Sequence, residues 1–139
     1  MAVQPLGIDH LVLRVADLPR TLAFYCGALG CTLERSREDL GLYHLRAGRA
    51  LIDVVTLDGP LGRAGGRAAG SEARNLDHFC LRIEPFDEAT LRAHLARHGI
   101  ELGKIERRFG AEGQGRSAYL RDPDGNVVEL KGPRENGAA

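Results

Sequence analysis

The sequence has no tryptophan and few other aromatic residues, and together these make up 5% of the chain. Proteins that bind single-stranded nucleic acid stack the bases on aromatic side chains, so such a platform is poorly supported. The charges also balance, with 19 basic and 19 acidic residues. Because no excess of positive charge is available, we expect no nucleic acid or other polyanion as a partner.

Cysteine is scarce and irregularly spaced. The three cysteines, Cys26, Cys31 and Cys80, are odd in number, and none belongs to a Cys-x-x-Cys motif. This pattern argues against a disulfide framework and against a zinc knuckle. We expect all three to be reduced, buried thiols.

Long apolar runs are missing as well. No segment approaches the roughly 20 apolar residues that a membrane-spanning helix requires. The first residues lack the basic and apolar regions of a signal peptide. We therefore expect a soluble, cytoplasmic protein that has no membrane partner.

An internal repeat is the most informative feature that is present. Residues 9–15, DHLVLRV, return as residues 77–83, DHFCLRI, with Asp, His, Leu and Arg at the same places. Each copy also ends in an apolar segment that carries one carboxylate, Asp53 in the first copy and Glu129 in the second. Such self-similarity indicates a duplicated module.

Each copy is predicted to fold as a β-α-β-β-β unit, because short alternating segments flank one helical segment. The first copy has expected strands at 8–15, 32–37, 40–46 and 50–57 and an expected helix at 18–29, which starts at Asp17 and stops at Gly30. The second copy has expected strands at 76–83, 100–107, 117–121 and 126–131 and an expected helix at 86–98. The predicted fold class is therefore α+β.

Composition divides the chain further. We expect one domain over residues 1–139, with a first module at about 7–58, a linker rich in Gly, Ala and Arg at 59–75, a second module at about 76–132 and a tail at 133–139. The sequence DPDG at 122–125 predicts a tight turn between the last two strands. The three glycines within residues 110–115 suggest a mobile flap over a site.

Four side chains at equivalent places in the two modules suggest a metal site. If a pseudo-twofold axis relates the modules, then His10, His78, Asp53 and Glu129 converge on one point. Nitrogen and oxygen ligands without a thiolate suit Ni, Co, Zn, Mn or Fe(II). The alternative is that the histidines are half-buried and the carboxylates pair with arginines. The repeated placement favours the metal, although Asp53 is short enough to act through water or behind the ligands.

Three further residues are candidates for substrate binding. Arg14 and Arg82 lie four residues after the two histidines on the same strand face, where they can clamp an anion or form salt bridges at the rim. Tyr119 can present its hydroxyl to a ligand or pack in the core.

The chain resembles the vicinal oxygen chelate superfamily, the glyoxalase, bleomycin-resistance and dioxygenase type. The resemblance covers residues 7–132, and its carriers are IDHLVLRVADLPRTLAFYCGALG at 8–30, LDHFCLRI at 76–83 and YLRDPDGNVVEL at 119–130. It implies two tandem βαβββ modules in a curved mixed sheet. It also implies a homodimer, and in many short members each cavity joins the first module of one subunit to the second module of the other.

The resemblance also assigns residues. His10, His78 and Glu129 fall on the common metal triad of the superfamily, and Asp53 falls where glyoxalase I has a fourth ligand. Arg14 matches a glyoxalase arginine that holds the carboxylate of glutathione.

These features predict a divalent-metal-dependent enzyme that acts on a small oxygen-chelating substrate, such as a glutathione adduct. The leading hypothesis is a lyase or isomerase like lactoylglutathione lyase, in which one metal ion per site stabilises an enediolate and Glu129 or Asp53 removes the proton. The alternatives are a metal-free drug- or metabolite-binding protein of the bleomycin-resistance type, a fosfomycin-type thiol transferase, and a ring-cleaving dioxygenase.

Overall fold

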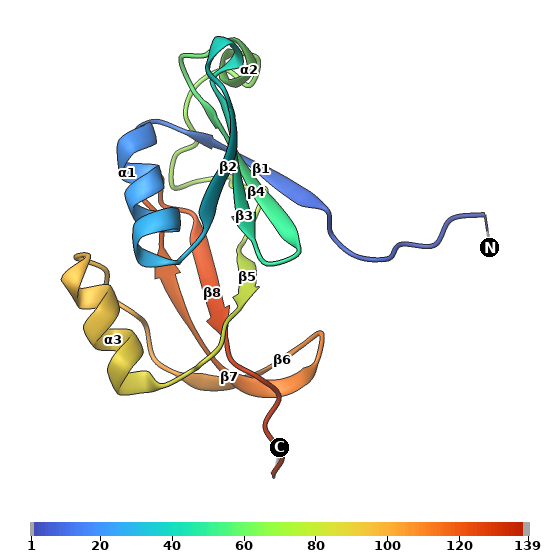
Figure 1. Cartoon of the computed structure of the whole chain (residues 1–139), viewed down its shortest axis with the longest axis vertical. Coiled ribbons are helices and arrows are strands. Elements are labelled where there is room, and N and C mark those ends of the chain that lie inside the picture. Colours follow the sequence, from blue (N-terminus) through green and yellow to red (C-terminus); the bar gives the residue numbers. More distant parts are fainter. Residues whose placement is uncertain (1, 138–139) are drawn as a thin grey trace. The chain divides into compact units, whose positions relative to one another are not determined.

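The computed structural model describes residues 2–137 and divides the chain between Gly70 and Ser71 into two compact units. The last two residues of the predicted tail, 138 and 139, lie outside the described residues. Each unit consists of one four-stranded mixed sheet with helical segments beside it (Figure 1). No helix within residues 2–137 is long and apolar enough to cross a membrane.

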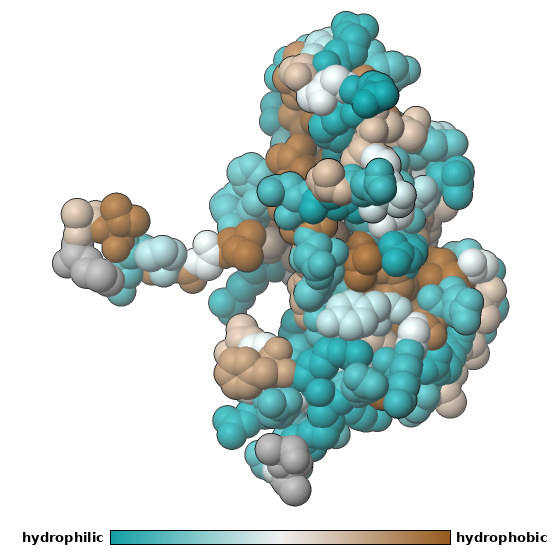
Figure 2. All heavy atoms as spheres, turned by 180° about the vertical axis from the view of Figure 1, so that it is seen from behind, coloured by the Kyte–Doolittle hydropathy of each residue, from teal (hydrophilic) through white to brown (hydrophobic). Residues whose placement is uncertain are grey.

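Unit 1 is a βαβββ module followed by a short helix. Its elements are β1 (His10–Val15), α1 (Leu18–Leu22), η1 (Ala23–Ala28), β2 (Thr32–Arg37), η2 (Glu38–Leu40), β3 (Leu42–Ala47), β4 (Ala50–Thr56) and α2 (Pro60–Arg63). The strand order is β1-β4-β3-β2, and β1 runs parallel to β4 while the other pairs are antiparallel. Before β1, the extended segment exposes the apolar side chains of Val3, Leu6 and Ile8 (Figure 2).

Unit 2 repeats this topology. Its elements are β5 (Phe79–Arg82), α3 (Glu88–Arg97), β6 (Glu106–Gly110), β7 (Gly113–Arg121) and β8 (Val127–Lys131). The order is β5-β8-β7-β6, again with one parallel pair, β5 and β8. The predicted α+β class with two tandem βαβββ modules is therefore confirmed.

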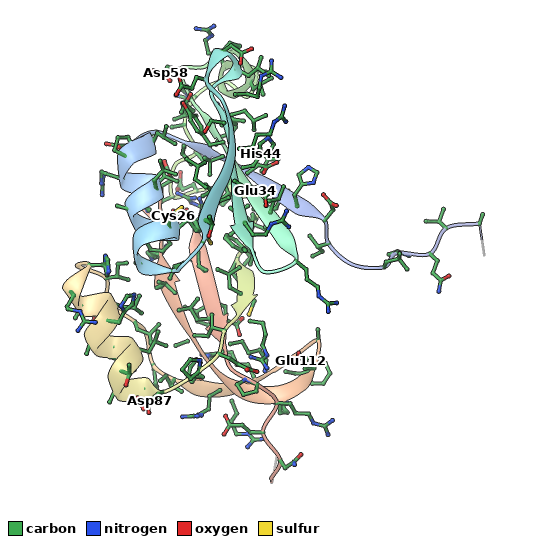
Figure 3. All side chains as sticks on the ribbon, in the orientation of Figure 1. Cys26, Glu34, His44, Asp58, Asp87 and Glu112 are labelled. Atoms are coloured by element: carbon green, nitrogen blue, oxygen red, sulfur yellow. The ribbon has the colours of Figure 1, made fainter. Side chains whose placement is uncertain are left out.

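Local signals in the sequence account for the ends of the helices. Asp17 caps α1 by accepting a hydrogen bond from the backbone N–H of Arg20 at 3.0 Å. Asp87 caps α3 in the same way through the N–H of Thr90 at 2.9 Å (Figure 3). Such caps satisfy N–H groups that have no partner inside the helix. After the helical segments, Gly30 and Gly99 have φ angles of +80° and +70°, which a residue without a Cβ adopts at little cost.

The two faces of the first sheet have different roles. Leu13, Val15 and Val54 point to one face, where they are buried together with Phe24 and Tyr25 of η1. Alternation along the strands then sends His10, Val12 and Asp53 to the opposite face. The core of the unit therefore lies under one face, and the candidate functional residues lie on the other.

The segment predicted to be helical at 18–29 is helical to Ala28, as α1 to Leu22 and then as the π-helical segment η1. Two other predictions about local structure were wrong. The strand predicted at 100–107 forms only from Glu106. The predicted flap at 110–115 is a tight hairpin, because β6 and β7 pair up to Gly110 and Gly113 and leave two residues in the turn. The segment predicted as the linker, 59–75, also contains the short helix α2, and its role as a linker stays a prediction.

All three cysteines are free thiols, but the prediction that all three are buried was wrong, because Cys26 is half-buried and Cys80 is exposed. Cys31 is buried, and its burial raises the pKa of the thiol to about 11. Because the thiolate is the reactive form, about one Cys31 thiol in a thousand is ionised at pH 8. We expect iodoacetamide to leave Cys31 unmodified in the native protein at pH 8 and to modify it in urea, as measured by peptide mass mapping. Rapid modification of the native thiol would contradict this burial.

Candidate functional site

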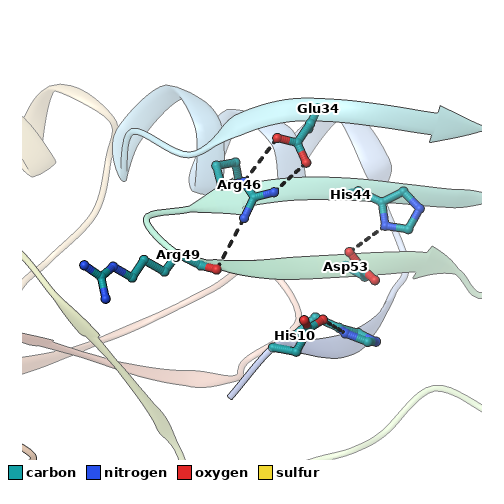
Figure 4. Close-up of polar contacts among 7 residues, drawn as sticks. His10, Glu34, His44, Arg46, Arg49 and Asp53 are labelled. Carbon is teal, nitrogen blue, oxygen red and sulfur yellow. Dashed lines mark hydrogen bonds and ion pairs between the residues drawn. The ribbon is translucent and has the colours of Figure 1, made fainter. Parts of the chain in front are cut away.

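A row of polar side chains crosses the face of the first sheet that lies opposite the core. Asp53 on β4 lies opposite His44 on β3, and the Nδ1 of His44 donates a hydrogen bond to Asp53 Oδ1 at 2.8 Å (Figure 4). His10 on β1 comes from the strand on the other side of β4. The His44 and Asp53 side chains are 15% and 6% exposed. Within residues 2–137, the buried Nε2 of His44 has no hydrogen-bond partner.

A corresponding row crosses the second sheet. Glu129 on β8 is buried, and its Oε1 lies 3.2 Å from the Nε2 of His78, which immediately precedes β5. Tyr119 on β7 lies opposite Glu129, and its ring packs edge-on against the His78 imidazole with centroids 5.2 Å apart. Partial burial and the negative charge of Glu129 raise the pKa of the Tyr119 hydroxyl.

Both predicted histidines are oriented by the aspartate that precedes them in the repeat. The Nδ1 of His10 donates to Asp9 at 2.6 Å, and the Nδ1 of His78 donates to Asp77 at 2.7 Å. The hydrogen bond to Asp9 raises the pKa of His10, and the nearby Asp53 charge adds to this effect. In each imidazole Nδ1 is occupied, so Nε2 is the nitrogen left to bind a ligand, which is the arrangement common in metal-binding histidines.

Sequence reasoning missed His44 and the two aspartates, although signals for them were present. The same Asp-His dipeptide appears in both copies of the repeat. The position of His44 can be found by counting residue pairs away from the hairpin turn at Gly48 and Arg49. Ala47 pairs with Ala50, and three pairs further along His44 pairs with Asp53. The same count in unit 2 pairs Tyr119 with Glu129. His44 and Tyr119 therefore hold equivalent positions beside the two carboxylates.

Arg14 is engaged by the segment that follows β4. Its guanidinium donates to the carbonyl oxygen of Gly62 at 2.8 and 3.1 Å, to that of Arg67 at 3.1 Å, and to that of Gly66. These bonds hold the chain after α2 against β1. The role of Arg14 as an anion clamp stays a prediction. An anion would have to replace these carbonyl oxygens as acceptors of the guanidinium hydrogen bonds.

Arg82 forms two short ion pairs, with Glu112 at 2.6 Å and with Glu84 at 2.6 Å. Glu112 lies in the turn of the β6–β7 hairpin (Figure 3), so this pair connects the turn to β5. Cys80 lies between His78 and Arg82 in the sequence. Partial desolvation and the Glu129 carboxylate raise the pKa of its thiol to about 11, which disfavours a nucleophilic thiolate.

The donor set of each unit suits part of a metal site. Each unit offers one imidazole whose Nε2 is not held by the preceding aspartate, and one carboxylate from a neighbouring parallel strand. In unit 2 these two groups already face each other, with His78 Nε2 3.2 Å from Glu129 Oε1. Glu129 is the better candidate ligand of the two acids, because Asp53 Oδ1 is already held by His44. Within residues 2–137, no three side chains of His, Cys, Asp and Glu gather as a metal ion requires. The joint site of His10, His78 and Glu129 therefore stays a prediction.

The family of the chain follows from comparison with known proteins. The model of the Glyoxalase/Bleomycin resistance protein/Dioxygenase superfamily matches residues 7–130. The chain belongs to this superfamily, as its sequence motifs and its paired βαβββ units suggest.

Individual relatives span nearly the whole chain. Virulence protein STM3117 of Salmonella typhimurium is 31% identical over 126 residues, which are 88% of this chain and 81% of that protein. The uncharacterized protein YaeR of Escherichia coli is 28% identical and covers 88% of this chain and 93% of its own. The fold is also similar to the crystal structure of STM3117, with a TM-score of 0.73 at 25% identity over 95% of this chain and all of the other. An integron cassette protein from V. cholerae has a TM-score of 0.71 at 28% identity, with coverage of 94% and 97%.

Proposed function

We propose that the chain is a divalent-metal-dependent enzyme of this superfamily that acts on a small oxygen-chelating substrate as a lyase or isomerase. The observation that carries the proposal is the repeated pair of a histidine and a buried carboxylate, each histidine anchored through Nδ1 by the aspartate before it. Each carboxylate is buried beside a histidine, Asp53 beside His44 and Glu129 beside His78. A bound cation would add a positive charge that offsets the cost of burying these carboxylates.

His10, His78 and Glu129 would hold the metal ion, which when bound supplies a Lewis acid to polarise a substrate carbonyl. Asp53 is suited to accept the proton next to that carbonyl. His44 fixes its Oδ1, while within residues 2–137 its Oδ2 accepts no hydrogen bond. A fixed carboxylate in a partly desolvated place is a better general base than a mobile one in water. His44 therefore acts as a positioning residue for Asp53.

The Glu129→Gln variant tests the metal requirement. We expect the wild-type chain dialysed against nickel or zinc to retain metal, and the variant to bind it about 100-fold more weakly, because the amide carries no charge. Metal content is measured by elemental analysis and affinity by calorimetry. Glu101→Gln is the matched control, since Glu101 is an exposed acid of the same unit.

Turnover completes the test. The metal-loaded protein is assayed with methylglyoxal and glutathione, and the hydroxyacyl thioester product is followed by its absorbance. Activity in the wild type and the control, lost in the Glu129→Gln variant, supports a glyoxalase-type reaction. A wild-type chain that retains no metal would reject the proposal and favour a metal-free binding protein. Retained metal without turnover would reject the glyoxalase substrate.

A further inference from the structure

Unit 2 contains a cavity beside the His78–Glu129 pair. Its volume is about 340 Å³, which suits a small organic molecule. The wall is formed by side chains of β5 and β8 and by the β6–β7 hairpin, namely His78, Cys80, Arg82, Phe109, Ala111, Glu112, Glu129 and Lys131, together with Gly110. The wall thus combines charged groups with an apolar part.

Lys131 is the cation of this cavity wall that has no ion-pair partner within residues 2–137. Arg82, the other cation, pairs with Glu84 and Glu112, and Glu129 lies against His78. Lys131 is only 6% exposed, yet its ammonium group forms no hydrogen bond or ion pair with any of residues 2–137. The ammonium group is not among the fully enclosed polar atoms, so it is accessible from the cavity and can receive an anion that enters there.

The β6–β7 hairpin is shaped to receive this lysine. A Cβ added at Gly110 would lie 2.7 Å from Lys131 Cε, and one added at Gly115 would lie 2.8 Å from Lys131 Nζ. A side chain at Gly110 would collide with the lysine, whereas at Gly115 the backbone carbonyl oxygen of Pro133 lies closer still, at 2.5 Å. Neither glycine has the positive φ angle that would itself require glycine. Gly110 therefore leaves room for the Lys131 side chain, and Gly115 leaves room for both the lysine and the Pro133 backbone.

We propose that this cavity binds a small organic carboxylate whose negative charge is received by the Lys131 ammonium group. A single unpaired cation beside Phe109 and Ala111 matches a monoanion with an apolar portion better than a phosphate dianion, which several donors normally hold. This inference rests on the proposed function, because the bound carboxylate is taken to be part of the substrate of the proposed enzyme. Lys131 then determines specificity, and His78 and Glu129 face the reacting end.

The chain offers a direct measurement because Lys104 and Lys131 are its only lysines. Protein labelled with ¹³C in lysine gives two ε-methylene signals, and Lys104 is an internal control with a side chain that is 84% exposed. We titrate the full chain with 2-oxobutyrate, with its neutral analogue 2-butanone, and with inorganic phosphate. We expect 2-oxobutyrate to shift the Lys131 signal saturably, and the other two probes to leave it unchanged.

Variants give the second readout. We expect Lys131→Gln to weaken binding of 2-oxobutyrate about tenfold in calorimetry, as loss of a charge-assisted hydrogen bond implies, and Lys104→Gln to leave it unchanged. Equal binding to Lys131→Gln, equal shifts of both lysines, or a response to 2-butanone would overturn the proposal. An equal response to phosphate would overturn the carboxylate assignment. If the Lys131→Gln variant does not fold, the Lys131 signal in the wild-type titration alone tests whether the carboxylate binds there.

The titration is repeated on protein treated with a chelator, which separates this proposal from the proposed function. A saturable Lys131 shift in a chain that never retains metal keeps the carboxylate site and rejects the metal-dependent enzyme. Metal retention and turnover without any Lys131 shift keep the enzyme and reject the carboxylate site.

Discussion

Replacement of Asp53 by alanine should lower the free energy of unfolding by about 4 kcal/mol, because it removes one partner of a buried pair. The Asp53 and His44 side chains are 6% and 15% exposed, and the bond between them is 2.8 Å long. His44 Nε2 already lacks a partner within residues 2–137, so the variant leaves the whole imidazole unsatisfied. Urea denaturation followed by circular dichroism measures the change.

Two comparisons make this prediction specific. Glu34→Ala breaks the Glu34–Arg46 pair on the same sheet, whose side chains are 48% and 39% exposed, and we expect little or no change in the urea midpoint because solvent screens this pair. Replacing both His44 and Asp53 by leucine removes the polar groups together, and we expect stability within about 1 kcal/mol of the wild type. In a double-mutant cycle, the single variants His44→Leu and Asp53→Leu should each lower stability, so the two positions are strongly coupled. A small effect of Asp53→Ala would show that the pair is open to water.

Such a result would also bear on function. If two leucines serve the fold as well as the pair does, then stability does not explain why a histidine and a carboxylate face each other there. The pair is then available for proton transfer at Asp53, as the proposed mechanism requires. The leucine double variant should accordingly fold normally and retain metal while it loses turnover.

Replacement of Gly62 by alanine should cost about 3 kcal/mol, because the added methyl group has no space. A Cβ at this position would lie 1.8 Å from the carbonyl oxygen of Thr56 and 2.6 Å from its carbonyl carbon. These are backbone atoms of β4, so no side-chain rotation relieves the clash. The helix α2 would have to leave the end of β4, and the hydrogen bonds from Arg14 to the Gly62 carbonyl would be disrupted.

Gly70→Ala is the matched control for this prediction. A Cβ at Gly70 meets no atom within 4 Å, and its φ angle does not require glycine. We expect this variant to unfold at the same urea concentration as the wild type. If Gly62→Ala proved equally harmless, the close packing of α2 on β4 would be incorrect, and Arg14 would be available for the anion-binding role predicted for it.

The repeat and the strand alternation made most of the architecture predictable. Strands at 32–37 and 50–57, the Asp17 cap and the DPDG turn all depend on neighbours within a few residues, and the structure contains each of them. The segment 100–105 was misjudged because its partner lies elsewhere in the chain. Gly103 bonds to Tyr119 and Arg92 bonds to the Leu102 carbonyl, which holds this segment without a regular ladder.

The candidate site, like the fold, was predictable from the sequence only in part. The sequence alone determined the duplicated module, its fold class and the two histidine and carboxylate pairs, because a repeat and a period of two are local properties of the chain. Only the tertiary structure decided which groups meet those residues: His44 beside Asp53, the Gly62 carbonyl at Arg14, and a lysine lying over two glycines. Hydrogen bonds and close packing join residues that are far apart in sequence, and their partners depend on strand register and turn geometry.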